Sequence, residues 1–166
     1  MSPVIDVAID AEDWAYLEAP SRLAEAAILA AIGESGVSLA ANAEISVVFC
    51  DDDFIRDLNR KWRGIDKPAS VLSFPARGDA ASAPLLGDIV IAFEAASREA
   101  SEEERPLRDH VAHLLVHGFL HLIGHDHVGA AEAATMEALE RAILGRLGIA
   151  DPYQESLIEE AADAND

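Results

Sequence analysis

The sequence predicts a single α+β domain with a small mixed sheet of about four strands and about five helices. Short apolar or alternating runs, bounded by Gly, Pro or Asp, are typical of strands. Longer segments with apolar residues at helical spacing lie between and after these runs. The chain has 166 residues, 51% of them hydrophobic, and no repeat or linker divides it. We therefore expect one core that forms without a disulfide framework.

The first part of the chain predicts a strand, a helix and a second strand. Residues 3–9 alternate apolar and polar side chains, which favours a half-buried strand. Ser21 is expected to cap an alanine- and leucine-rich helix that ends near Gly33 or Gly36. Residues 44–50 form an apolar run that predicts the second strand.

The middle of the chain predicts a second helix and a short strand. The aspartates at 51–53 offer an N-cap and favourable negative charge to a helix that runs to about Trp62. Residues 64–68 contain Gly, Asp and Pro and predict a turn. A short strand follows at 71–74, and Pro75 is expected to stop it.

The last part of the chain predicts one more strand and mainly helices. Residues 77–84 are mostly Gly, Ala, Ser and Asp, so we expect a flexible loop before an apolar strand at 87–93. From Glu94 onward the apolar period is helical. Pro106 suits the first turn of the next helix, and a final helix spans about 130–147.

All six histidines lie between His110 and His127, which indicates an arrangement of nitrogen ligands. His117 and His121 are at i and i+4, so both side chains leave the same helix face one turn apart. Gly124 can adopt a positive φ and end the helix, which turns the chain back toward that face. His127 then becomes a third donor. The sequence therefore predicts a metal site formed by His117, His121 and His127.

The spacing of this trio is that of a metalloprotease-like helix, His-Glu-x-x-His-x-x-Gly-x-x-His. The general-base glutamate of that motif is replaced by Gly118, which cannot accept a proton. Three imidazoles favour zinc, although nickel, copper or cobalt would also suit them. Three ligands leave one position for water, as in catalytic sites, so hydrolysis is the expected chemistry. Asp126 is either a partner of a ligand histidine or a solvated loop carboxylate.

Other histidine sets are possible on the same helix. His110, His113, His117 and His121 all lie on one side of a helical wheel, and His113 with His117 is also an i, i+4 pair. The trio is favoured because it alone includes a glycine turn and a third donor. His110 and His113 are expected to support the ligands or to be structural, and His125 fits either role.

The charge distribution points to a basic cluster on an acidic protein. The formal net charge is −19, yet five of the twelve basic residues lie between positions 56 and 67. Arg56 and Arg60 can be balanced by Asp57 and Asp66 on a solvated helix, whereas Arg63 begins a turn and can point into a cleft. The acidic surface elsewhere would repel free RNA and attract a basic protein partner.

The sequence also suggests a compartment. A single cysteine, Cys50, excludes an internal disulfide and fits a reducing environment. The N-terminal residues are acidic, with no basic residue before Arg22, so they lack the charged start of a secretory signal. No segment is long and apolar enough to span a bilayer. We expect a cytoplasmic protein with no membrane role.

With these motifs in view, the chain resembles the bacterial YbeY family of metal-dependent endoribonucleases. The resemblance rests on three sequence blocks that occur in the family's order and spacing. They are Leu58-Asn59 through Arg63-Gly64 to Asp66-Lys67-Pro68, then Val71-Leu72-Ser73-Phe74-Pro75, and Leu86-Gly87-Asp88-Ile89-Val90-Ile91 followed by His117 to His127.

The resemblance implies a zinc-dependent endoribonuclease domain at 1–150. The residues at 151–166 lie outside the family pattern, and their acidic composition predicts a frayed tail. The resemblance also implies zinc on His117, His121 and His127, with Arg63, His117 and His121 as catalytic residues. It further implies action on single-stranded RNA, in 3′-end maturation of small-subunit ribosomal RNA and in ribosome quality control. The small ribosomal subunit and a basic ribosomal protein on it are the expected partners.

Two positions depart from the family pattern. His125 stands where tyrosine is frequent, and Ala69 where threonine is common, so Ser70 would have to supply any hydroxyl there. Two other functions also fit the residues alone. One is a ribosome assembly factor in which the metal is structural. The other is a zinc peptidase, which the glycine at position 118 disfavours.

Overall fold

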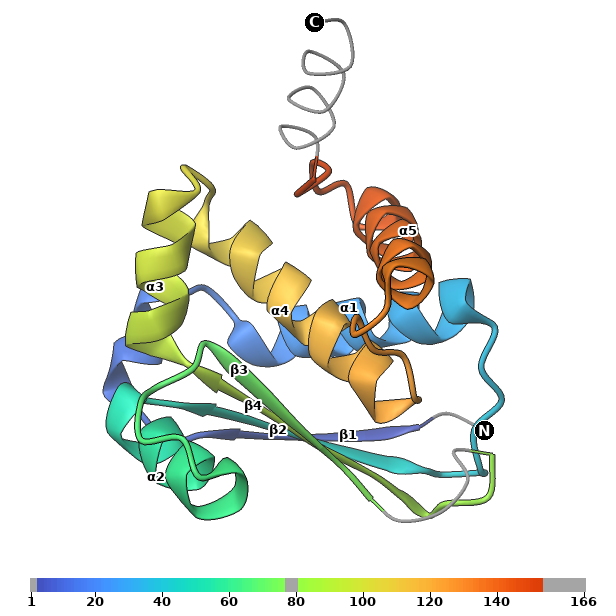
Figure 1. Ribbon diagram of the computed structural model, residues 1–166, viewed down its shortest axis with the longest axis horizontal. Coiled ribbons are helices and arrows are strands. Elements are labelled where there is room, and N and C mark those ends of the chain that lie inside the picture. The colour runs from blue at the N-terminus through green and yellow to red at the C-terminus, as the bar shows by residue number, and fades with distance from the viewer. Residues whose placement is uncertain (1–2, 77–80, 154–166) are drawn as a thin grey trace, which may run out of the picture.

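The computed structural model describes residues 3–76 and 81–153 and has one four-stranded mixed sheet (Figure 1). The strand order is β1-β2-β4-β3. The strands are β1 (Val4–Ile9), β2 (Glu44–Cys50), β3 (Val71–Pro75) and β4 (Leu85–Ala92). β1, β2 and β4 are parallel, and β3 pairs antiparallel with β4 at one edge. The predicted α+β fold with a small mixed sheet is confirmed.

In the described part of the chain, five α-helices are distributed unequally over the two faces of this sheet. Most of them cover the same face (Figure 1). The covering helices are α1 (Pro20–Ser35), α3 (Phe93–Glu102), α4 (Leu107–Leu122) and α5 (Ala130–Arg146). α2 (Asp52–Arg63) is the helix on the opposite face.

Strand alternation divides the core between the two faces. Ile45, Val47 and Ile89 are fully buried in the cluster that includes α1, α4 and α5. Val90 belongs to a second, smaller cluster beneath α2, with Val48 packed against it. Successive strand residues point to opposite faces, so the apolar strands of this sheet support both layers.

The predicted start of the first helix is wrong. The N-cap is Ala19, with a left-handed φ of 47°, and Ser21 lies inside the first turn without capping it. Pro20 occupies the start of the helix because its fixed φ and missing N–H suit that place. The end of the helix was correctly predicted, since Gly36 is the C-cap with a φ of 71°.

A short 3₁₀ helix, η1 (Glu12–Tyr16), has no counterpart among the predicted elements. Its five residues are too few to show a helical period. Trp14 is fully buried there, and its indole N–H donates to the carbonyl oxygen of Cys50 at 2.9 Å. This segment therefore closes the end of β2 rather than being a free loop.

Other boundaries agree closely with the sequence. Asp51 caps α2 by accepting from the Phe54 N–H at 2.9 Å, as predicted. Pro75 ends β3, where an edge strand tolerates a residue without an N–H. β4 begins at Leu85, two residues earlier than expected. Residues 77–80 of the predicted loop and 154–166 of the predicted tail lie outside the described residues.

In the part of the chain that the structure describes, no helix combines the length and apolar character needed to cross a bilayer.

Candidate metal centre

Helix α4 and the turn after it bring three imidazoles together. The Nε2 atoms of His117 and His121 are 3.0 Å apart. The helix ends at Leu122, and Gly124 adopts a φ of +101°, so the chain reverses direction. His127 returns to the two ring nitrogens, and the ligand atoms of all three residues lie within 4.8 Å of one another. The predicted trio and the predicted role of the glycine turn are both present.

The donor set fits a transition-metal ion. Tetrahedral zinc with Zn–N bonds of about 2.0–2.1 Å places its nitrogens about 3.3 Å apart, close to the His117–His121 separation. Within residues 3–76 and 81–153, no fourth His, Cys, Asp or Glu donor joins this group. His127 is exposed. Three nitrogens with one open side are typical of a catalytic rather than a closed structural site.

His117 and His121 each have their other ring nitrogen, Nδ1, engaged by an acceptor. His117 Nδ1 lies 2.7 Å from Glu140 Oε1, and His121 Nδ1 lies 2.8 Å from the carbonyl oxygen of His125. Since neither partner can donate, Nδ1 must carry the proton on each ring, which leaves Nε2 as the metal donor. Burial and the neighbouring His117 lower the pKa of His121, which favours the neutral form that binds a metal.

Sequence reasoning did not find Glu140, the partner of His117. Burial alone would raise its pKa, but hydrogen bonds from His113 and His117 outweigh burial and hold the pKa at about 2. The available signal was its position in the buried stripe of α5, between Met136 and Ile143. A carboxylate in such a stripe needs a partner, because an unpaired buried charge is costly.

The remaining histidines lie outside the trio. His110 Nε2 is 2.7 Å from Glu99 Oε2, and His113 Nε2 is 2.8 Å from Glu140 Oε2. His125 contributes its backbone oxygen to His121. Asp126 is exposed and accepts from the Val128 N–H at 3.0 Å, which matches the loop-carboxylate alternative.

Gly118 is required by the packing of α4 on the sheet. A Cβ at this position would lie 2.9 Å from Ile89 Cγ2 and 3.0 Å from Ser73 Oγ. The Ser73 hydroxyl also donates to the Gly118 carbonyl oxygen at 3.0 Å. A glutamate side chain would therefore meet β3 and β4 rather than the metal side of the helix, which argues against a peptidase.

We expect Gly118→Ala to destabilise the fold by about 1–3 kcal/mol, because the added methyl group overpacks the α4–sheet contact. Urea unfolding followed by circular dichroism would measure this. Gly145→Ala is the matched control, since a Cβ there meets nothing within 4 Å inside α5. It should leave stability unchanged or raise it by up to about 1 kcal/mol. Equal stabilities for the two variants would contradict the packing argument.

Arg63 lies across a shared cavity from the imidazoles. The cavity has a volume of about 560 Å³ and is bordered by Arg63, by β3 and by the α4 end with its turn, including His117, His121 and His127. Gly64, with a φ of 71°, ends α2 directly after the arginine. Asn59 Nδ2 donates to the Lys67 carbonyl oxygen at 2.9 Å, which anchors the following turn.

The neighbouring arginines are paired, as predicted. Arg56 contacts Asp66 at 2.9 Å, and Arg60 contacts Asp57 at 3.1 Å. Within the described ranges, Arg63 has no hydrogen bond or ion pair. Its guanidinium is therefore available to an anion in the cavity.

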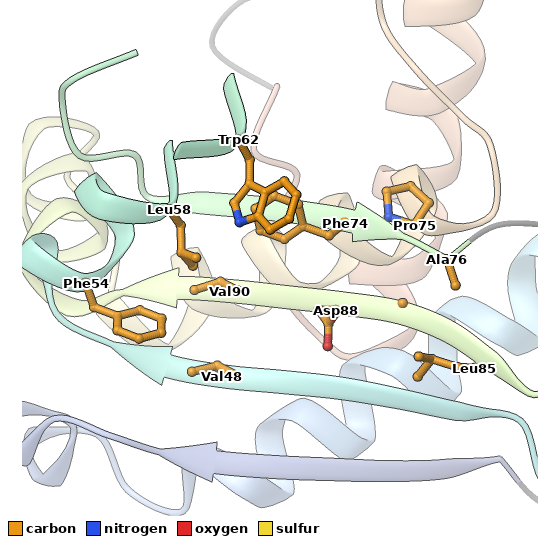
Figure 2. Close-up of a pocket in the computed structure, with 11 residues that line it drawn as sticks. Val48, Phe54, Leu58, Trp62, Phe74, Pro75, Ala76, Leu85, Asp88 and Val90 are labelled. Carbon is orange, nitrogen blue, oxygen red and sulfur yellow. The ribbon is translucent and has the colours of Figure 1, made fainter. Parts of the chain in front are cut away.

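A second concave surface lies on the α2 face of the sheet. Figure 2 shows Phe54, Leu58 and Trp62 from α2 beside Val90 and Phe74 of the strands. This cavity has a volume of about 570 Å³, and Trp62 is 64% exposed. Asp88 is the charged residue in the lining. The mainly apolar lining suits side chains of another molecule better than a phosphate.

Fold and site define an α+β protein with an open cluster of three histidines that could hold a metal ion and with an arginine on the same cavity. The model of the family described as Endoribonuclease YbeY matches residues 9–148. The chain belongs to the YbeY family.

Individual relatives agree with this assignment. The chain is 64% identical over 157 residues to Endoribonuclease YbeY of Methylocella silvestris, covering 95% of this chain and 89% of the relative. It is 54% identical over 160 residues to the protein of the same name from Beijerinckia indica, covering 92% and 78%. The solution structure of TM1509 from Thermotoga maritima shares the fold, with a TM-score of 0.55 at 22% identity, over 87% of this chain and 91% of that one.

Proposed function

We propose that this protein is a zinc-dependent endoribonuclease that cuts single-stranded RNA. We propose further that it acts in the cytoplasm in 3′-end maturation of small-subunit ribosomal RNA and in ribosome quality control. The observation that carries the proposal is the single cavity that Arg63 shares with His117, His121 and His127. Membership of a family whose relatives are named endoribonucleases supports the choice of RNA as substrate.

The residues around the cavity have two different proposed roles, metal binding and phosphate binding. His117, His121 and His127 would hold the zinc ion through ring nitrogens. When bound, zinc would act as a Lewis acid that polarises a phosphodiester oxygen and activates water for hydrolysis. Arg63 would bind the scissile phosphate and stabilise the negative charge that develops on it during cleavage.

The shape and charge of the protein support a single-stranded substrate. The reacting phosphate must enter a cavity between β3 and the turn that carries His125 to His127. A flexible strand can bend into this space, whereas a duplex holds its backbone in fixed helical geometry. The net charge of −19 would also repel an extended nucleic-acid surface outside the arginine region.

The same net charge supports a basic ribosomal protein as the partner that brings the enzyme to the small subunit. The apolar cavity beside α2 supports the second candidate function, a ribosome assembly factor with a structural metal, because it offers a binding surface away from the histidines (Figure 2).

Metal removal distinguishes the two functions. Chelation of the purified protein should abolish cleavage of a single-stranded RNA, and added Zn²⁺ should restore it. Cosedimentation with small ribosomal subunits should persist in the chelated protein, because none of the three histidines borders the apolar cavity beside α2. Cleavage that survives complete metal loss would refute the zinc-dependent enzyme. Chelation that abolishes subunit binding without changing RNA cleavage would favour the assembly factor.

A further inference from the structure

Glu140 is a buried carboxylate at the centre of a network that ends at the metal site. Its side chain is 1% exposed, and it lies on α5 in the buried stripe that includes Met136, Ile143 and Leu144. An isolated carboxylate in such surroundings would be strongly unfavourable. Its presence there requires a set of partners that satisfies both oxygens.

Those partners come from two other parts of the chain. Oε1 is 2.7 Å from His117 Nδ1 and Oε2 is 2.8 Å from His113 Nε2, both on α4. The hydroxyl of Tyr153 donates to Oε2 as well. The carboxylate thus links a proposed metal ligand to a residue after the last helix.

Tyr153 is itself held in place on α5. Its backbone N–H donates to Asp151 Oδ1 at 2.8 Å, and Asp151 Oδ2 is 3.4 Å from Arg141 Nε. The Arg141 guanidinium lies 5.2 Å from the centroid of the Tyr153 ring. Tyr153 lies beyond residue 148, where the family match ends, in a segment to which the sequence assigned no function.

We propose that Glu140 is a positioning residue of the metal centre and that Tyr153 fixes its carboxylate. Glu140 would hold His117 with its proton on Nδ1 and its Nε2 directed at the ion, while its negative charge strengthens that nitrogen as a donor. The inference rests on the proposed function in one respect, namely that the three-histidine site binds zinc.

The two helical ligands differ in how they are held. His121 donates to a neutral backbone oxygen of His125, so its orientation depends on the turn after α4. His117 depends on a charged side chain from another helix. Loss of an outer partner of this kind typically lowers metal affinity about 10- to 100-fold. The His117 side of the site should therefore be sensitive to changes on α5.

Zinc affinity, measured by competition with a chromogenic chelator, tests the proposal without RNA cleavage. Glu140→Gln should weaken zinc binding by about 10- to 100-fold. Glu137→Gln is the matched control, because Glu137 is a partly exposed residue of the same helix, paired only weakly with Arg141 at 4.0 Å. It should bind zinc as the wild type does. Tyr153→Phe should weaken binding by about three- to tenfold, because the carboxylate loses a donor.

Imidazole nitrogen chemical shifts of the ¹⁵N-labelled, metal-free protein give a second readout, one that a general loss of stability would not mimic. His117 should carry its proton on Nδ1 in the wild type and Glu137→Gln, and should become a mixture of tautomers in Glu140→Gln. If Glu140→Gln does not fold, the affinity of Tyr153→Phe decides the question.

The outcomes separate this inference from the proposed function. Wild-type protein that binds no zinc would overturn both. Wild-type protein that binds zinc, with Glu140→Gln or Tyr153→Phe within twofold of it, would overturn the positioning role alone. Reduced affinity with unchanged tautomer populations would also overturn it, because the effect would then not act through His117.

Discussion

His117→Ala is expected to abolish zinc binding and to reduce RNA cleavage by roughly 10³-fold or more, a loss of about 4 kcal/mol of transition-state stabilisation. The substitution removes one of three nitrogen donors, and a two-histidine remnant cannot hold the ion in a defined position. It also leaves Glu140 with one fewer buried donor. Zinc content by elemental analysis and single-turnover cleavage of a labelled single-stranded RNA would measure both effects.

His125→Ala is the control for the first prediction. Its ring lies outside the trio, and its backbone oxygen still accepts the His121 hydrogen bond after truncation. This variant should retain one zinc ion per chain. If His117→Ala, purified to homogeneity, cleaves RNA at the wild-type rate, the activity belongs to a contaminant or to another site.

Arg63→Glu is expected to lower cleavage by about 10²- to 10³-fold while zinc content stays at one ion per chain, because the loss is of transition-state electrostatics rather than of a ligand. The reversed charge would also repel the incoming phosphate. Cleavage rates at saturating and limiting RNA would separate the effect on the chemical step from that on binding.

Arg60→Glu is the matched control for the second prediction. It changes net charge by the same amount on the same helix, but Arg60 is paired with Asp57 on the surface and does not border the metal cavity. Long-range repulsion of RNA should affect both variants equally. An equal loss of activity in both variants would mean that Arg63 acts only through the overall charge of the protein and not by binding phosphate in the cavity.

The convergence of the three imidazoles could be predicted from the sequence because it is local. His117, His121 and His127 are set by helical spacing and one glycine turn, both of which are properties of adjacent residues. The fold class followed from strand and helix periods for the same reason. The sequence also predicted that Arg63 begins a turn and can point into a cleft. The structure adds the cavity that Arg63 shares with the histidines.

Features that depend on contacts between distant elements were beyond the sequence. Glu140 lies on α5 and contacts His117 on α4. In the sequence alone it looks like any other charged residue of a helix. Gly118 could be recognised as a missing base, but its packing against Ile89 required the sheet to be in place. The Ser21 cap failed because Pro20 begins the helix one residue before it, a competition between two valid start signals.

The edge strand β3 joins the two sides of the cavity. The three imidazoles come from eleven consecutive positions, 117 to 127, and can converge as soon as α4 and its turn have formed. The arginine belongs to a remote part of the chain and shares a cavity with them where β3 is docked along β4 and against α4. A molecule in which β3 has detached should therefore still capture a cation, but it would have lost the cavity in which the arginine faces the imidazoles.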